Sequence, residues 1–590
     1  MLEILKRFWR PYRANLIVGP ACKLIEVLFD LLTPLVVARM IDEGIRSRDM
    51  DTVLRYGLVL LAMAVAGILF ALVCQKMASR ASQGIGTDVR RDLYARINEF
   101  SYAELDRFGT PSLVTRITND VNQIQLAVAL AIRQLIRWPF LAVGSMAAAL
   151  LIDPLLGTVF IVTAPVIGGV FWWVMARTIP LYRRIQAMLD RVGLITREGL
   201  SGVRVIRAFV REEHERTRFR EAADGQMRLS VAVGRLNALL NPATFLIMNL
   251  GICVILWQGG LAVGIGRLTQ GEIVAIVNYM TQTLLSIVYV ANLVIVFTRA
   301  SASSSRVLEV LDCEPSIVSP ERARVPAHTA DAPAIRLDRA SFAFGEAAAP
   351  AVDGISLELP AGATLGVIGG TGSGKSTLIS LLPRLYDTTS GTVEILGADV
   401  RSWPLDELRR TIGLVPQAAS LVSGTIRSNL LWRDPAAADD ELWRALDTAQ
   451  AGEFVRKLPE GLDAPVEAGG RNFSGGQRQR LTIARALVGA TRILILDDAA
   501  SALDLRTDAA LREAVRRRAE ASDTPLTTVI VSQRVSSVRT ADQILVMRRG
   551  RAVGLGTHDG LLASCAVYRE ICASQGVAVP PAATGEEVSA

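Results

Sequence analysis

The first 300 residues contain several apolar stretches that are each about as long as a membrane is thick. A bilayer core of about 30 Å takes about twenty helical residues to cross, so uncharged apolar runs of that length indicate membrane spans. Four such runs are residues 56–75, 154–176, 236–266 and 273–298. Two weaker candidates are residues 138–152, which are short unless their helix begins near Ala127, and residues 16–41, which include charged residues. The sequence therefore predicts six membrane-spanning helices, with both ends of the segment on one side of the membrane.

The composition also requires a soluble part. Hydrophobic residues make up 51% of the 590 residues, yet charged residues still make up 21%. A single core rarely grows past about 250 to 300 residues, so we expect at least two domains. The net charge of +7 is explained by the excess of Lys and Arg that membrane proteins carry on cytoplasmic loops, and we expect no nucleic-acid partner. The six cysteines form no CxxC pair, so we expect neither a zinc site nor a disulfide framework.

Two of the connections between spans are long and rich in arginine, and they are residues 76–137 and 177–235. The positive-inside rule places them, and with them both chain termini, in the cytoplasm. Because they contain few Gly or Pro residues, we expect helices that continue beyond the membrane and turn back near residues 108–113 and 207–213. Basic and aromatic residues alternate before the first span, which predicts an amphipathic helix on the cytoplasmic membrane face.

Charged side chains occur within two of the predicted spans. Lys23, Glu26 and Asp30 share one helix face by their spacing, and so do Arg133 and Arg137. Charges at membrane depth face a bundle interior or a water-filled cavity. Two interpretations are open, a polar translocation pathway and internal ion pairs. The polar side chains of the last span that are open to the same two interpretations are Asn278, Tyr279, Gln282, Tyr289 and Asn292.

The chain becomes rich in Ser, Pro and Ala after the last span, which is typical of a linker. We therefore divide the chain into a transmembrane domain, a linker, a second domain and a disordered tail. The predicted boundaries are residues 1–310, 311–334, 335–575 and 576–590, respectively.

The second domain contains a phosphate-binding loop. A β-rich run, residues 363–368, precedes the pattern GxxxxGKS and an apolar helix, which is the context that a P-loop requires. Its backbone amides close around phosphates, Lys375 reaches the outer phosphates, and the Ser376 hydroxyl coordinates magnesium. The predicted nucleotide-binding residues of this loop are Thr371, Gly372, Ser373, Gly374, Lys375, Ser376 and Thr377.

Further motifs follow in a fixed order. The segment NFSGGQRQRLTIARAL, residues 472–487, precedes an apolar strand that ends in two acids, ILILDD, residues 493–498. Here the sequence resembles ATP-binding cassettes. Their signature motif matches Ser474, Gly475, Gly476 and Gln477, and in that family it caps the nucleotide held by the opposite subunit.

The same resemblance assigns other residues. Asp497 matches the magnesium-linked acid of the Walker B motif, and Gln417 matches the Q-loop residue that connects magnesium to the membrane domain. Phe344 occupies the place of the aromatic residue that stacks on adenine, and residues 501–504 match the D-loop. The implied cofactors are ATP and Mg²⁺, with Ser376, Gln417 and Asp497 at the metal.

The resemblance extends to the membrane half. Residues 108–121 and 199–219 look like the first and second intracellular loops of ABC exporters, so we expect their turns to dock on nucleotide-binding domains. The implied fold is multidomain, with a six-helix transmembrane domain of ABC exporter type and an α/β P-loop nucleotide-binding domain. The implied location is the cytoplasmic membrane. The implied activity is ATP-driven export of a small amphipathic or hydrophobic molecule, such as a drug or a lipid-like compound.

Two positions depart from the family pattern, and both concern hydrolysis. Walker B normally ends in Asp-Glu, but this chain has Asp498, which withdraws the carboxylate by about 1 Å, and misplacement on that scale can cost about 10²-fold in rate. The family's H-loop His is replaced by Gln533, whose neutral amide cannot carry the imidazole's proton or charge. This pair of changes resembles the degenerate-site half of bacterial heterodimeric multidrug exporters. The implied partner is a second half-transporter with the consensus Walker B Glu and H-loop His.

A homodimeric exporter with slow ATPase activity and an exporter-fold importer of a siderophore-like ligand both fit the same motifs. A soluble cassette ATPase is excluded by the six spans, and the intact signature with a full set of spans argues against a regulatory subunit that does not transport. No segment of the sequence is a recognition code for the transported molecule.

Overall fold

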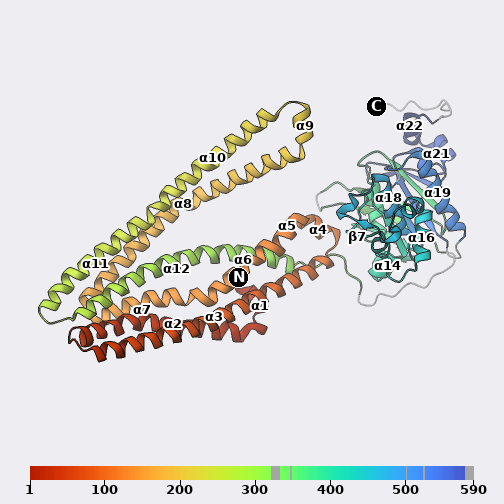
Figure 1. Cartoon of the computed structure of the whole chain (residues 1–590). Coiled ribbons are helices and arrows are strands. Elements are labelled where there is room, and N and C mark those ends of the chain that lie inside the picture. Colours follow the sequence, from red (N-terminus) through yellow and green to blue (C-terminus); the bar gives the residue numbers. More distant parts are fainter. Residues whose placement is uncertain (321–331, 346–347, 500, 522–524, 578–590) are drawn as a thin grey trace. The chain divides into compact units, whose positions relative to one another are not determined.

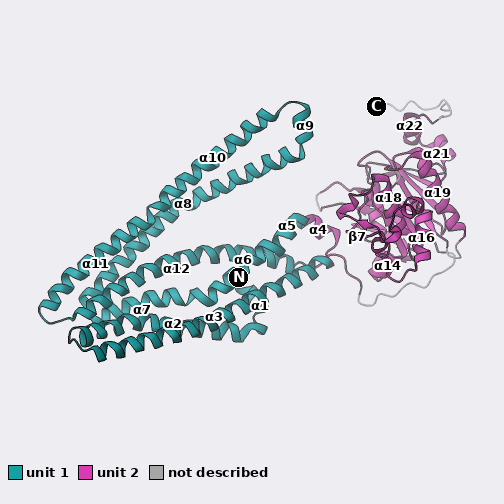
Figure 2. Ribbon diagram, in the orientation of Figure 1, with its two compact units in different colours: residues 1–98, 108–313 teal, residues 99–107, 314–590 magenta. Residues whose placement is uncertain are grey.

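The structure is a computed structural model that describes residues 1–320, 332–345, 348–499, 501–521 and 525–577. The chain divides into two compact units (Figure 2). Unit 1 consists of residues 1–98 and 108–313, and unit 2 consists of residues 99–107 and 314–590. Part of the predicted linker, residues 321–331, and the predicted disordered tail from residue 578 onward lie outside the described residues.

Unit 1 is helical (Figure 1). Its longer helices are α2 Arg13–Arg39, α3 Met50–Glu99, α7 Arg137–Ile152, α8 Pro154–Ser201, α10 Glu212–Ala238, α11 Leu240–Gly264 and α12 Gln270–Leu311. Shorter helices are α1 Leu2–Phe8, α5 Thr110–Thr115, α6 Val121–Leu130 and α9 Val203–Ala208, and π-helical turns occupy Met40–Ile45, Arg116–Asp120 and Ala131–Leu135. The short helix α9 forms the turn between α8 and α10, which pack side by side (Figure 1).

Among the described residues, five continuous helical stretches are long and apolar enough to cross a membrane. They are Met50–Glu99, Thr110–Ile152, Pro154–Ser201, Glu212–Gly264 and Gln270–Leu311. The prediction of a helical transmembrane domain with several apolar helices is confirmed. The first predicted span forms helix α2 but is not among the five, and it carries the charged residues Lys23, Glu26 and Asp30.

Lys23, Glu26 and Asp30 of the first predicted span form ion pairs with one another or with Arg137. Glu26 lies 2.6 Å from Lys23 Nζ and 2.8 Å from Arg137 Nη1, and Arg137 Nη2 lies 3.2 Å from Asp30 Oδ2. Glu26 and Asp30 also line a cavity of about 470 Å³ whose other lining side chains, from α2 and α3, are mainly apolar. The structure therefore shows internal ion pairs, which was one of the two interpretations of these charges. The carboxylates of Glu26 and Asp30 also lie beside a cavity.

Three polar side chains of the last span hold neighbouring helices together. The Tyr279 hydroxyl donates to the Leu31 carbonyl oxygen over 2.5 Å, and Gln282 Nε2 donates to the Asp30 carbonyl oxygen over 3.3 Å. The Tyr289 ring stacks on the Trp138 ring at 4.0 Å. By contrast, Asn278 and Asn292 are exposed. These contacts are those of helix packing within the bundle.

Unit 2 contains two larger sheets. The first is antiparallel, in the order β2 Val352–Leu359, β1 Ile335–Phe342, β4 Ser390–Ile395 and β5 Ala398–Asp399. The second has the order β12 Arg551–Gly556, β11 Gln543–Arg548, β3 Thr364–Gly369, β10 Thr527–Ser532, β9 Ile493–Asp497 and β6 Ile412–Val415, and only β12 is antiparallel. A small third sheet pairs β7 Gly424–Thr425 with β8 Pro465–Val466.

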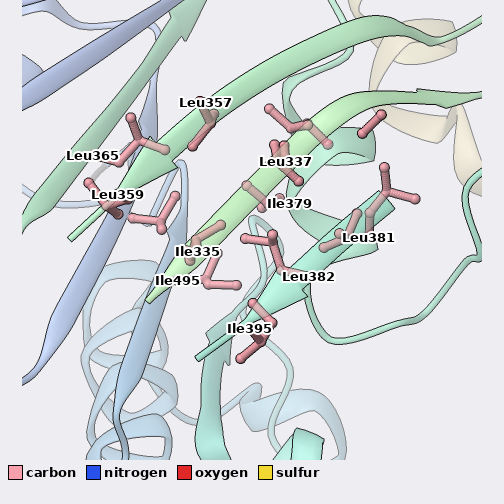
Figure 3. Close-up of a cluster of buried hydrophobic side chains, with 14 of the residues drawn as sticks. Ile335, Leu337, Leu357, Leu359, Leu365, Ile379, Leu381, Leu382, Ile395 and Ile495 are labelled. Atoms are coloured by element: carbon pink, nitrogen blue, oxygen red, sulfur yellow. The ribbon is translucent and has the colours of Figure 1, made fainter. Parts of the chain in front are cut away.

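The helices of unit 2 have at most 16 residues among those described. They are α4 Tyr102–Phe108, most of which belongs to this unit, α13 Lys375–Leu381, α14 Leu405–Thr411, α15 Ile426–Leu430, α16 Asp439–Thr448, α17 Gly452–Arg456, α18 Gly475–Leu487, α19 Leu505–Glu520, α20 Val535–Val538, α21 His558–Ser564 and α22 Ala566–Ser574. A buried apolar cluster joins the two larger sheets and α13, with Ile335, Leu357, Leu365, Ile379 and Ile495 among its members (Figure 3). The predicted α/β nucleotide-binding fold is confirmed. Parallel strands of such a sheet present their carboxyl ends at one edge, where ligands bind.

Part of the first long connection packs within unit 2. The Tyr386 hydroxyl donates to Asp106 Oδ2 over 2.7 Å, the Tyr102 ring lies 6.0 Å from the Tyr386 ring, and the Ser101 and Ser316 hydroxyls are 2.8 Å apart. Ser101, Tyr102 and Asp106 lie just upstream of residues 108–113, where the sequence predicts the turn. The chain then changes direction at Gly109, whose φ of 73° lies in the region that glycine favours.

Candidate functional site

The loop between β3 and α13 requires glycine. Gly372 and Gly374 have φ values of 74° and 96°, which L-residues rarely adopt. A Cβ atom on Gly374 would lie 2.2 Å from the Ala351 carbonyl oxygen, so no larger residue fits. The predicted residues Thr371, Gly372, Ser373 and Gly374 therefore form the tight turn of a P-loop at the carboxyl end of a parallel strand.

Lys375 begins α13 and turns back over this loop. Its Nζ atom donates to the carbonyl oxygens of Gly369 and Gly370 over 2.9 and 2.7 Å, and it lies 3.4 Å from Ser373 Oγ. Burial lowers the pKa of Lys375, while the two acids at positions 497 and 498 act in the opposite direction. The ammonium group is thus held at the place where the outer phosphates of a nucleotide would lie.

The magnesium candidates Ser376 and Asp497 meet. Asp497 ends β9, and its Oδ1 atom accepts a hydrogen bond from Ser376 Oγ over 3.1 Å. Burial raises the pKa of Asp497, and the bond from Ser376 opposes that shift. A hydroxyl and a carboxylate beside a phosphate loop are the hard oxygen donors that Mg²⁺ takes together with substrate phosphates, so the residues fit this ion. Thr377 follows on α13.

Asp498 lies beside Gln417 and adopts an unusual backbone conformation. Its φ is 46°, and its backbone N–H donates to the Val531 carbonyl oxygen over 2.9 Å. Gln417 Nε2 lies 3.5 Å from Asp498 Oδ2, so the two predicted site residues are neighbours. Burial raises the pKa of Asp498, and the positive charges of Arg534 and Lys375 partly offset that effect.

Gln533 follows the end of β10, between the P-loop strand and the Walker B strand. Ser532 pairs with Ile368 of β3, and Val531 pairs with Asp497 of β9. The backbone of Gln533 therefore lies next to both motifs, at the place where the sequence put the H-loop position. Its carbonyl oxygen accepts a hydrogen bond from Gln575 Nε2 over 2.7 Å.

The signature residues form the start of helix α18. Ser474 caps the helix, since its Oγ accepts from the Gln477 N–H over 3.3 Å and Gln477 Oε1 accepts from the Ser474 N–H over 2.9 Å. A Cβ atom on Gly475 would meet no atom within 4 Å, whereas one on Gly476 would lie 3.2 Å from the Ala502 carbonyl oxygen. The amide end of α18 is thus preformed and open on the Gly475 side, as binding of an anion from outside requires.

Phe344 is 61% exposed and presents an aromatic ring that is available for stacking. Its edge contacts the rings of Phe342 and Tyr386, with centroids 4.9 and 5.6 Å away. Sequence reasoning missed Tyr386, Arg534 and Gln575. Only Arg534 had a local signal, since it directly follows the H-loop position; the others reach the site through contacts between segments far apart in the chain.

Comparisons with known proteins agree with this geometry. Residues 16–288 match the family of the ABC transporter transmembrane region, and residues 352–501 match the family described as ABC transporter. A Mycobacterium tuberculosis protein described as an uncharacterised ABC transporter ATP-binding protein is 37% identical over 588 residues, which cover 99% of this chain and 100% of the relative.

Two further relatives have more specific descriptions. A multidrug efflux ATP-binding/permease protein of M. tuberculosis is 32% identical over 95% of this chain and 46% of its own length. An ATP-dependent lipid A-core flippase of Syntrophus aciditrophicus is 29% identical over 97% of this chain and 94% of its own length.

A solved structure of a bacterial Atm1-family ABC exporter with ATP bound has the same fold. Its TM-score is 0.76 at 24% identity, over 98% of this chain and 99% of that chain. With the phosphate loop, the capped signature helix and the apolar helices described above, these matches identify the chain. It belongs to the ABC transporters and is an exporter-type half-transporter in which a membrane domain and an ATPase domain are fused.

Proposed function

We propose that this chain is the ATP-binding subunit of a heterodimeric exporter in the cytoplasmic membrane, and that it moves a small amphipathic or hydrophobic molecule by alternating access. Two relatives, which are described as a multidrug efflux protein and a lipid A-core flippase, support this class of molecule and an outward direction. The long apolar helices support a membrane domain that encloses such a path.

The observation that carries the heterodimer is the pair Asp498 and Gln533. Both lie at the carboxyl ends of neighbouring strands, beside the phosphate loop, at the two positions where the family places its catalytic Glu and His. A carboxylate withdrawn by about 1 Å polarises water less well, and misplacement on that scale can cost about 10²-fold in rate. An amide at position 533 can donate and accept a hydrogen bond but cannot carry a proton or a positive charge. This site is therefore proposed to bind ATP and to hydrolyse it slowly.

Binding itself has its full set of groups. Magnesium would be held by Ser376, Asp497 and Gln417, and it would neutralise charge on the phosphates. Lys375 would exchange its loop carbonyl oxygens for phosphate oxygens, and Phe344 would stack on the base. The family resemblance supports all of these assignments, and the distances given above support those of Lys375, Ser376 and Asp497.

The intact signature supplies the second half of the proposal. In a head-to-tail pair of cassettes, Ser474 and the amides of Gly475 and Gly476 would face the ATP that the partner holds. Backbone donors at a helix N-terminus stabilise charge that develops on a transferred phosphoryl group. The partner is therefore proposed to carry the consensus Walker B Glu and H-loop His, and the complete hydrolytic site would be shared between its P-loop and this chain's signature.

The test compares the purified chain alone with the chain co-purified with the half-transporter encoded beside it. We expect turnover well below about 1 per second for the chain alone and turnover of about 1 to 10 per second for the pair. A Lys375→Ala variant of this chain serves as the control for hydrolysis at its own site. If the chain alone reached typical turnover and Lys375→Ala abolished it, a homodimeric exporter would replace the heterodimer. Uptake and efflux assays in inverted vesicles decide between export and import.

A further inference from the structure

The end of the described chain is bonded directly to the H-loop position of the ATP site. Gln575 follows helix α22, and its side-chain amide contacts the backbone on both sides of Arg534. Its Nε2 atom donates to the Gln533 carbonyl oxygen over 2.7 Å, and its Oε1 atom accepts from the Val535 N–H over 2.8 Å. One side chain thus satisfies two backbone groups of a segment about forty residues away.

Helix α22, which precedes Gln575, is held in place by packing. Tyr568 and Cys572 of α22 are fully buried in an apolar cluster that also contains Val535 and Val538 of α20. The backbone N–H of Gln575 donates to the Cys572 carbonyl oxygen over 3.1 Å, which fixes the residue at the helix end. The position from which the Gln575 side chain reaches out is therefore set by packing, although the side chain itself is exposed.

The contact closes a short segment that is anchored at its other end by Walker B. Val531 accepts a hydrogen bond from the Asp498 N–H over 2.9 Å, and Ser532 Oγ accepts one from the Arg534 N–H over 3.0 Å. Arg534 lies between the two groups that Gln575 holds, and its positive charge is close enough to Asp498 to oppose part of the rise that burial causes in the pKa of that carboxyl. Residues 531–535, which we name the switch segment, are thus held by Asp498 at one end and by Gln575 at the other.

We propose that Gln575 is a positioning residue of the ATP site, which holds the switch segment so that position 533 lies level with the outermost phosphate of the nucleotide. The inference rests on the proposed nucleotide binding at this chain's own P-loop. Gln575 does not touch the nucleotide in this proposal; it acts through Gln533 and Arg534. Because ADP lacks the outermost phosphate, loss of the contact should weaken the binding of ATP more than that of ADP.

The test uses the full-length chain in nanodiscs, with ATP and ADP in the presence of Mg²⁺ as probes. Gln575→Met keeps the length of the side chain and removes both hydrogen bonds, and Gln575→Ala is the second variant. Ser564→Ala is the matched control, because among the contacts described the exposed Ser564 hydroxyl bonds only within α21, to the Gly560 carbonyl oxygen over 2.8 Å. Dissociation constants are measured for both nucleotides, and amide hydrogen exchange is followed at Val535.

Loss of one exposed hydrogen bond corresponds to about a threefold change in an equilibrium constant. For Gln575→Met we expect the preference for ATP over ADP to fall by at least about threefold and the Val535 amide to exchange at least about threefold faster. Ser564→Ala should match the unchanged chain in both measurements.

Three results would overturn the inference. The first is an unchanged preference for ATP, with or without faster exchange at Val535. The second is an equal loss of ATP and ADP binding, which would indicate general structural support. The third is a reduced preference for ATP while exchange at Val535 stays the same, because the effect would then not pass through the switch segment. If the unchanged chain bound neither nucleotide, the proposed function would fail instead.

Discussion

A negative charge at Gly475 should stop the exporter without disturbing the fold of this chain. A Cβ atom at this position meets nothing within 4 Å, so Gly475→Asp has room. Gly475 is the first residue of the 13-residue helix α18, where an added acid favours the helix by about 0.3 to 1 kcal/mol. We therefore expect the unfolding temperature of the chain to stay the same or to rise.

Gly475→Asp should lower the ATPase rate only if Gly475 faces the partner's ATP. Two like unit charges about 4 Å apart repel by about 4 kcal/mol at an effective dielectric constant of about 20. One third of that value, about 1.4 kcal/mol, already lowers a rate tenfold. Gly475→Asp should therefore reduce the ATPase rate of the co-purified pair by at least about tenfold. Gly475→Asn has the same size without the charge and is the matched control.

The assay measures phosphate release by the reconstituted pair at saturating ATP. Asp498→Asn in this chain is measured beside the Gly475 variants. It should change the ATPase rate by much less, because this chain's own ATP site already lacks the family's Glu and His. Equal losses for Gly475→Asp and Gly475→Asn would show that size and not charge matters. A larger loss from Asp498→Asn would show that this chain's own site is the main site of ATP hydrolysis. The proposal that the partner's site hydrolyses most of the ATP would then be wrong.

Three further outcomes are expected. Lys375→Ala should abolish photolabelling of this chain by a nucleotide analogue while the partner's labelling remains; undiminished labelling of the variant contradicts the role of the P-loop. Cysteines placed in residues 207–213 should crosslink to the region around Gln417 in a nucleotide-binding domain, and an absence of crosslinks to either cassette counts against docking of this turn. Asp498→Asn should raise the unfolding temperature of the nucleotide-free chain at pH 7, since burial raises the pKa of this carboxyl and its ionised form therefore opposes folding. That gain should vanish as the pH falls below about 3.9, the ordinary pKa of Asp, where the carboxyl is protonated in both states, and a gain that persists there would refute this cause.

The parts of the site that sequence could predict are contiguous motifs. A P-loop holds its phosphate groups within a few consecutive residues, and Lys375 and Ser376 are therefore recognisable from their neighbours alone. The capped start of α18 can likewise be predicted from four consecutive residues, because the two residues of its capping box, Ser474 and Gln477, are three positions apart.

The contacts that sequence could not predict join distant segments. Asp106 and Tyr386 are 280 positions apart, and Gln533 and Gln575 are 42 apart. Each residue type is common on protein surfaces, and nothing in its immediate neighbourhood marks it. These pairs depend on how separate helices and sheets pack, which a local pattern does not encode.

The first predicted span shows a related difficulty. Its charges make helix α2 too polar to count as a membrane span by composition, yet the same charges are paired within unit 1. One of the partners, Arg137, comes from α7, more than a hundred positions away. Hydropathy counts each charge as if it faced lipid alone, so it undervalues a helix whose charges are neutralised by a neighbour.

The fixation of residues 99–107 to the cassette has a mechanical consequence. These residues follow α3 and precede α5 in the chain, so the segment that packs within unit 2 is joined at both ends to helices of unit 1. Helix α3 has 50 residues, which corresponds to a rod of about 75 Å at about 1.5 Å per residue. A tilt of only about 5° applied at one end of such a rod displaces the other end by about 7 Å. By leverage alone, a small tilt at one end of α3 would thus become a displacement of several ångströms at its other end.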